Sequence, residues 1–219
     1  MVAPNYDHAA TKAAELLVRY KINATPISPL PILKTLPGVL VVSFAEMAFQ
    51  MCEDRQNIMT TFSMDQDAVT SIKIVDGNLR YIVAYNQRLP FYMLQRALAR
   101  ELAHIVLQHD GTLPQEVRMA EAHCFANHFL CPRPVLKAIE QTGIIMTIEN
   151  LGCVTGCYER CLIGLRKTPA CHVPVELNRQ IKSQFLDYIK SFAEFVWLIQ
   201  NEDNTPAADF GTFMDGYEE

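Results

Sequence analysis

Two stretches near the middle of the chain hold most of the side chains that could do chemistry. Carboxylates and imidazoles at helical spacing can hold a divalent cation such as zinc, and a carboxylate beside that cation can act as a general base. The residues of this kind are Arg100, Glu101, His104 and His109 in the first stretch, and Glu121, His123 and His128 in the second.

The first stretch is close to the pattern His-Glu-x-x-His. Two histidines four residues apart lie on one helix face and can share a zinc ion, while the glutamate between them activates the bound water. In this chain the five positions are filled by Arg100, Glu101, Leu102, Ala103 and His104. The base and the second ligand are therefore present, and an arginine replaces the first ligand.

Taken together, the two stretches resemble the ImmA/IrrE family of zincin-like metallo-endopeptidases, over roughly residues 8–166. The family has a strand pair, a helix with His-Glu-x-x-His, and a second helix of the type Glu-Ala-x-x-Phe-Ala-x-x-x-Leu-x-Pro. The segment 154–162 is similar, less closely, to a later helix of the family. The second motif is matched by Glu121, Ala122, Phe125, Ala126, Leu130 and Pro132.

The resemblance implies an α+β fold of zincin type, with a small antiparallel or mixed sheet and a helical bundle that carries the active-site helix. It also implies that His104 and Glu121 are metal ligands and that Glu101 is the general base. Arginine stays protonated and cannot donate a lone pair to a cation, so two protein ligands remain where catalytic zinc keeps three. We therefore expect zinc to be absent or weakly bound, and Arg100 to replace its charge by pairing with Glu121 or Glu101.

Two further histidines could rescue the metal site. His109 is five residues after His104, and on a continuing helix it would be rotated off that face. His128 shares a face with Glu121 but lies two turns, about 10 Å, along the axis. The pattern thus makes both accessory candidates at best, and His123 is expected to point elsewhere.

Simpler interpretations exist for each of these features. Arg100 and Glu101 could be solvated charges on a helix, and His104 a hydrogen-bonded core histidine. The four-residue spacing of three cysteines could indicate a metal site, although packing of small apolar residues explains it equally. The apolar end of the last helix could be a partner surface or could cover the central helices. These residues are Cys153, Cys157 and Cys161, and Phe195 and Trp197.

Hydrophobic periodicity and turn residues give the expected elements. Pro26, Pro29, Pro31 and Pro37 exclude a long helix between the first helix and the first strand, and Asp76-Gly77 favours a hairpin turn. The expected helices are 8–20, 45–52, 90–109, 115–130, 134–142, 147–166 and 175–200, and the expected strands are 39–44, 68–75 and 78–85.

These elements suggest a zincin-like domain over residues 1–170, a C-terminal helix over 171–200 and an acidic, disordered tail over 201–219. The chain has 219 residues and a net charge of −5, concentrated in the tail, so the composition does not favour nucleic-acid binding. No apolar run reaches the length of a membrane span, and seven cysteines without an export signal suggest a reducing cytoplasm.

Two functions follow from the resemblance. In the first, the chain is a degenerate member that acts by binding a regulatory protein, such as a helix-turn-helix repressor of a bacterial mobile element, phage or stress response. In the second, it is a hydrolase, an active zinc metallo-endopeptidase with altered ligands. The sequence leaves the partner and the oligomeric state open.

Overall fold

The computed structural model describes residues 2–51, 67–75, 78–109, 112–156 and 169–201. Its elements, in chain order, are α1 (Tyr6–Arg19), α2 (Pro29–Thr35), β1 (Val39–Ser43), α3 (Phe44–Met51), β2 (Ala68–Val75), β3 (Asn78–Tyr85), α5 (Phe91–Val106), α6 (Gln115–Leu130), α7 (Arg133–Glu140), α8 (Ile148–Thr155), α10 (Val175–Gln184) and α11 (Leu186–Asn201).

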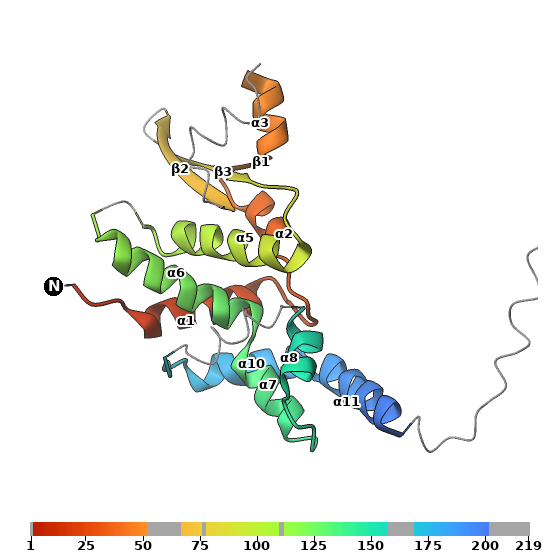
Figure 1. Cartoon of the computed structure of the whole chain (residues 1–219). Coiled ribbons are helices and arrows are strands. Elements are labelled where there is room, and N and C mark those ends of the chain that lie inside the picture. Colours follow the sequence, from red (N-terminus) through yellow and green to blue (C-terminus); the bar gives the residue numbers. More distant parts are fainter. Residues whose placement is uncertain (1, 52–66, 76–77, 110–111, 157–168, 202–219) are drawn as a thin grey trace, which may run out of the picture.

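The three described strands form one mixed sheet in the order β1-β3-β2. β1 runs parallel to β3, and β2 pairs with β3 in the antiparallel direction. The predicted hairpin is therefore confirmed, although its turn, residues 76–77, lies outside the described residues. Figure 1 shows α5 beneath the sheet, α6 and α1 beyond α5, and α3 above the sheet. A small sheet on a helical bundle is the α+β class that the sequence predicts.

Alanines allow α5 and α6 to pack closely at the centre of the molecule. Ala99 and Ala103 on α5 and Ala122 and Ala126 on α6 are fully buried. Small side chains let two helix backbones approach each other, and contacts between α5 and α6 are extensive. The two motif helices are thus held side by side over most of their length.

Three predicted boundaries are wrong. α5 ends at Val106 instead of near residue 109. α8 ends at Thr155, because Gly156 adopts φ 65°, and a Cβ atom on this glycine would lie 2.8 Å from Cβ of Pro26. The rest of the helix predicted to residue 166 lies outside the described residues. The single helix predicted over 175–200 is interrupted at Phe185, which separates α10 from α11.

The proline-rich connector contains a helix that the sequence did not predict. α2 has 7 residues, and Pro29 and Pro31 lie in its first turn. Proline is tolerated there because the first amide groups of a helix have no intrahelical acceptor. The prolines thus exclude a long helix, as expected, but permit a short one.

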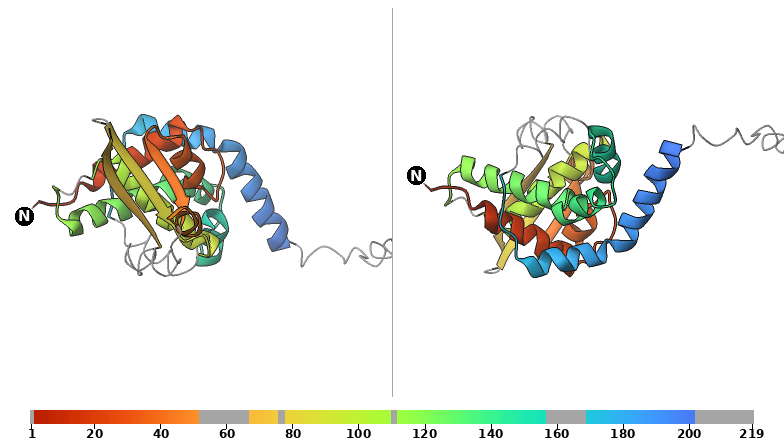
Figure 2. Two further views of the ribbon diagram at one scale, coloured as in Figure 1. Left: turned by 90° about the horizontal axis from the view of Figure 1, so that it is seen from above. Right: turned by 90° about the horizontal axis from the view of Figure 1, so that it is seen from below.

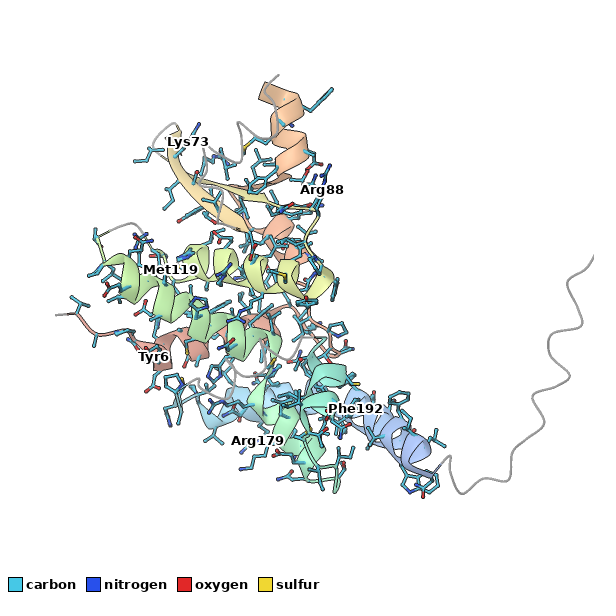
Figure 3. All side chains as sticks on the ribbon, in the orientation of Figure 1. Tyr6, Lys73, Arg88, Met119, Arg179 and Phe192 are labelled. Carbon is cyan, nitrogen blue, oxygen red and sulfur yellow. The ribbon has the colours of Figure 1, made fainter. Side chains whose placement is uncertain are left out.

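α11 extends away from the rest of the molecule in both views of Figure 2. Phe192, labelled in Figure 3, lies on the half of this helix nearest to α10 and is buried. Phe195 and Trp197, in the next turn, are 52% and 63% exposed. None of the described helices has both the length and the apolar character that crossing a membrane requires. The tail predicted over 201–219 lies, beyond Asn201, outside the described residues.

Candidate functional site

Glu101, the expected general base, is buried beneath the sheet. Its Oε2 atom accepts a hydrogen bond of 2.7 Å from Oγ1 of Thr70 on β2. Burial raises the pKa of this carboxyl group, and the hydrogen bond from Thr70 and the charge of Arg100 oppose that shift. The carboxylate of Glu101 therefore has one neutral donor and little access to water.

Arg100 does not pair with either glutamate. Its guanidinium lies 3.9 Å from Oδ2 of Asp67, just before β2, and its Nε atom is buried without a hydrogen-bond partner. The expected pairing with Glu101 or Glu121 is therefore wrong. The reason is that Glu101 is bonded to Thr70 and that both oxygens of Glu121 have other donors.

Glu121, His109 and His104 form one hydrogen-bonded chain between α5 and α6. Nε2 of His109 lies 2.9 Å from Oε2 of Glu121, and Nδ1 of His109 lies 2.8 Å from Nδ1 of His104. The backbone N–H of Asn5 donates to Oε1 of Glu121 at 2.6 Å. The prediction that His109 is rotated away from His104 is wrong, since His109 bonds to both expected ligands.

The end of α5 explains the position of His109. Gln108 adopts φ 56°, its N–H donates to the carbonyl of Ile105, and the N–H of His109 donates to the carbonyl of His104. These two bonds define a Schellman motif, which ends a helix and turns the chain back across its last turn. The side chain of His109 is thereby brought next to His104.

Positive charge surrounds His104. Burial is the main cause that lowers the pKa of His104 to about 4, and the charges of His109, Arg118 and Arg100 lower it further. The Nε atom of Arg118, like that of Arg100, is buried without a hydrogen-bond partner. Two fixed cations this close to an imidazole oppose the binding of a divalent metal ion.

The residues present do not fit the three-ligand zinc site of a zincin. Arg100 cannot ligate a cation, and His104 and Glu121 are already bonded to His109. Within the described part of the chain, three potential ligand atoms lie within 4.8 Å of one another in one group only, and that group is elsewhere. The metal roles predicted for His104, Glu121 and Glu101 stay predictions.

The two remaining histidines have different surroundings. His128 lies in that other group, with Cys124 and Cys171, and not with Glu121. His123, expected to point elsewhere, has its pKa lowered by burial and then by the charge of Arg100, so it borders the same cationic region. Some residues that bond to the site, or act on it by their charge, were not predicted, because nothing in the central motifs indicates them. They are Asn5, Asp67, Thr70 and Arg118.

The mixed sheet over α5, and the packing of α5 against α6 with the remnant of a His-Glu-x-x-His motif, define a zincin-like domain. The model of one protein family, Peptidase_M78 (IrrE N-terminal-like domain), matches residues 53–149. The matched part of the chain, which includes the hairpin, α5 and α6, is therefore similar to that family. Searches of curated proteins and of solved structures gave no significant match.

Proposed function

We propose that the chain is a degenerate zincin-like protein, inactive or weakly active as a peptidase, that binds a regulatory protein. The partner by analogy with the family is a helix-turn-helix repressor of a mobile element or stress response, in the cytoplasm of a bacterium. The family match supports the zincin-like part of this proposal.

One observation carries the loss of catalysis. The chain from His104 through His109 to Glu121 uses the atoms that would otherwise approach a metal ion, and Arg100 occupies the place of the first ligand. The closed hydrogen-bond chain satisfies these side chains without a metal. Zinc, if it enters this region, is expected to bind weakly.

The exposed side of α11 supports a protein partner. Phe195, Trp197, Leu198 and Ile199 are each more than half exposed, whereas Val196 on the same turn is buried. A helix that is apolar on all sides normally has neighbours on all sides. The outer side of α11 is therefore a candidate contact surface for the repressor.

The test compares the wild-type chain with Glu101→Gln against a set of purified helix-turn-helix repressors. We expect equal binding by both proteins and no cleavage by either, with binding reduced about tenfold or more in Trp197→Ser. Cleavage by the wild-type chain that Glu101→Gln abolishes would overturn the loss of catalysis. Absence of binding to every repressor would contradict the proposal that the partner is a helix-turn-helix repressor.

The position of His109 favours a second candidate, the metallo-endopeptidase with altered ligands. His109 contacts both His104 and Glu121, so it is the residue that could substitute for the missing histidine. This candidate requires zinc in protein purified without added metal and a loss of that zinc in His109→Ala. Both measurements belong in a Cys171→Ser background, so that the second group of ligand atoms does not contribute.

The substitution Arg100→His separates two histories of the site. If it creates zinc binding and proteolysis, the chain has lost a single ligand. If zinc does not bind, the region around Arg118 and His123 has also changed.

A further inference from the structure

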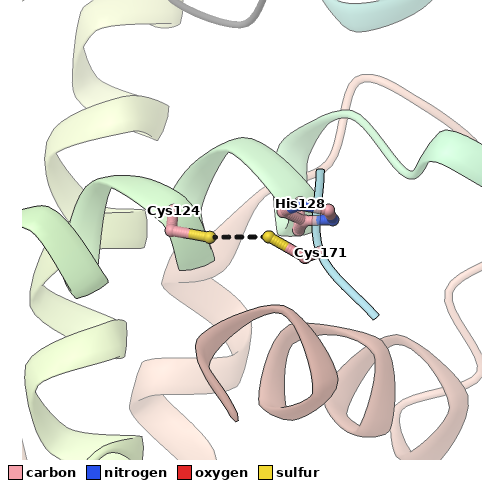
Figure 4. Close-up of side chains that lie close together, drawn as sticks. All are labelled: Cys124, His128 and Cys171. Carbon is pink, nitrogen blue, oxygen red and sulfur yellow. Dashed lines mark hydrogen bonds between the residues drawn. The ribbon is translucent and has the colours of Figure 1, made fainter. Parts of the chain in front are cut away.

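A group of two cysteines and one histidine lies further along α6 than the site described above, on the same face of the helix as Glu121. Cys124 and His128 are four residues apart on α6, and Cys171 belongs to the segment that leads into α10. Figure 4 shows the three side chains converging between α6 and this segment. One potential ligand atom from each residue lies within 4.8 Å of the other two.

We propose that Cys124, His128 and Cys171 bind a zinc ion that fastens the C-terminal helices to the family domain. The site differs in residues and in position from the His-Glu-x-x-His remnant, so it does not depend on the proposed function.

The distance between the two sulfur atoms fits a metal. Sγ of Cys124 lies 3.6 Å from Sγ of Cys171. Two thiolates on a tetrahedral zinc ion, each at about 2.3 Å, are separated by about 3.8 Å. A disulfide would require about 2.05 Å between the same atoms.

The histidine supplies a second, independent observation. His128 is 8% exposed, and its Nε2 atom is buried without a hydrogen-bond partner. A buried imidazole nitrogen in that state loses the bond it had with water, and a metal ion would restore the loss. A neutral imidazole can donate this lone pair to zinc.

The segment that carries Cys171 is fixed on both sides of the cysteine. Arg133 donates a hydrogen bond of 3.1 Å to the carbonyl of Pro169, and the N–H of His172 donates one of 2.7 Å to Asp7. These bonds hold the segment against the start of α7 and against α1. The third ligand is therefore in place before a metal arrives, which reduces the entropy lost on binding.

The charge and the space around the three residues also suit zinc. Binding releases one proton from each thiol to solvent, and two thiolates with a neutral imidazole make the bound site neutral overall. A cavity of about 70 Å³, lined by His128 and Cys171 among others, adjoins the group. It has room for a water molecule as fourth ligand, since one water occupies about 30 Å³ in the liquid.

The experiment measures zinc per chain in full-length protein purified under reducing conditions, stripped with a chelator and reloaded with zinc chloride. The variants are Cys171→Ser and His128→Gln, with Cys153→Ser as matched control because Cys153 is an exposed cysteine outside the group. We expect about one zinc in the wild-type chain and the control, and at least a tenfold loss in both variants. Cobalt in place of zinc should give thiolate-to-metal charge-transfer bands that Cys171→Ser weakens.

Three outcomes would overturn the proposal. The first is no zinc or cobalt binding by the wild-type chain. The second is zinc that Cys171→Ser retains and Glu121→Gln loses, which would place the metal at the motif site. The third is a disulfide between Cys124 and Cys171 that persists through purification under reducing conditions, found by alkylation and mass spectrometry. Circular dichroism of Cys171→Ser, in which a half-buried thiol becomes a hydroxyl, shows whether a loss of zinc reflects unfolding.

Discussion

The two halves of α6 treat their polar groups differently. In the first half, Glu121 accepts bonds from Asn5 and from His109, and His109 also bonds to His104. In the second half, two turns further along the same face, the Nε2 atom of His128 has no partner. Buried polar groups are normally satisfied, so the first half resembles a finished network and the second half a network that lacks one member.

This difference shows why a motif and a binding site need separate tests. The half of α6 around Glu121 lies beside an arginine where a ligand is expected, and its bonds are closed within the chain. The half around His128 keeps three ligand atoms close together with one unsatisfied. This contrast can be tested, and a substitution of His109 has the largest expected effect.

His109→Ala should cost about 3–5 kcal/mol of unfolding free energy, because the buried carboxylate of Glu121 loses the bond to His109 and keeps only the N–H donor of Asn5. His128→Ala in chelator-treated protein should cost only about 1 kcal/mol, a typical value for one substitution, because no bond of Nε2 is lost. Urea denaturation measures both values.

The double variant His109→Ala, Glu121→Gln provides the control for that comparison. Replacing the carboxylate of Glu121 by an amide should recover part of the lost stability, which identifies the charge as the cause. Equal costs for His109→Ala and His128→Ala would contradict the proposed difference between the two halves of α6.

Acid should destabilise the metal-free protein through two histidines, His104 at the motif site and His128 in the second half of α6. The pKa of His104 and that of His128 are each lowered to about 4, whereas an unfolded histidine titrates near 6.5. Between these values the unfolded chain binds more protons than the folded chain, so stability is complete above pH 6.5 and falls as the pH decreases toward 4. Each histidine contributes at most about 3 kcal/mol.

The measurement is urea denaturation from pH 7 to pH 4 in the presence of a chelator. His104→Gln and His128→Gln should each reduce the slope of stability against pH in that window. A slope that neither variant changes would mean that other groups cause the acid sensitivity.

Zinc should stabilise the protein through the second half of α6 only. At a free zinc concentration of about 100 times Kd, a single site adds about 2.7 kcal/mol to the unfolding free energy. Cys171→Ser should abolish this increment, whereas Glu121→Gln, in the first half, should retain it. Thermal unfolding with and without zinc measures the two shifts, and the reverse pattern would assign the metal to the motif site.

Local signals in the sequence account for the part of the fold that was predicted. Pro90 and Pro114 precede α5 and α6, Pro132 follows α6, and apolar residues recur at helical spacing in α5. The hairpin was predicted from the turn dipeptide Asp76-Gly77, and its two strands are paired. Such features depend on neighbours in the chain, so a single sequence suffices to find them.

The rest depends on contacts between distant residues or on unmarked backbone conformations. Cys124 and Cys171 are 47 residues apart, and no spacing rule joins them. The break at Phe185 was missed because apolar residues continue at helical spacing on both sides of it. The turn that places His109 needs a left-handed residue at Gln108, where glycine would have been the usual signal.

That turn gives the smallest predicted effect and a matched control. Gln108 and Lys21 both have positive φ, 56° and 51°, and both end a helix with the same pair of backbone bonds. A β-branched residue is strongly disfavoured in this conformation. Gln108→Val and Lys21→Val should therefore cost similar amounts, about 1–2 kcal/mol, by urea denaturation.

The two variants should differ at the motif site. Gln108→Val loosens the turn that holds His109 against His104, so the pKa of His104 should rise from about 4 toward the ordinary value of 6.5. Lys21→Val, at the end of α1, should leave that pKa unchanged at an equal loss of stability. Titration of the histidine resonances by NMR measures both. An unchanged pKa of His104 in Gln108→Val would mean that the turn does not maintain the His104–His109 contact. The bond between His109 and Glu121 would then hold His109 in place instead.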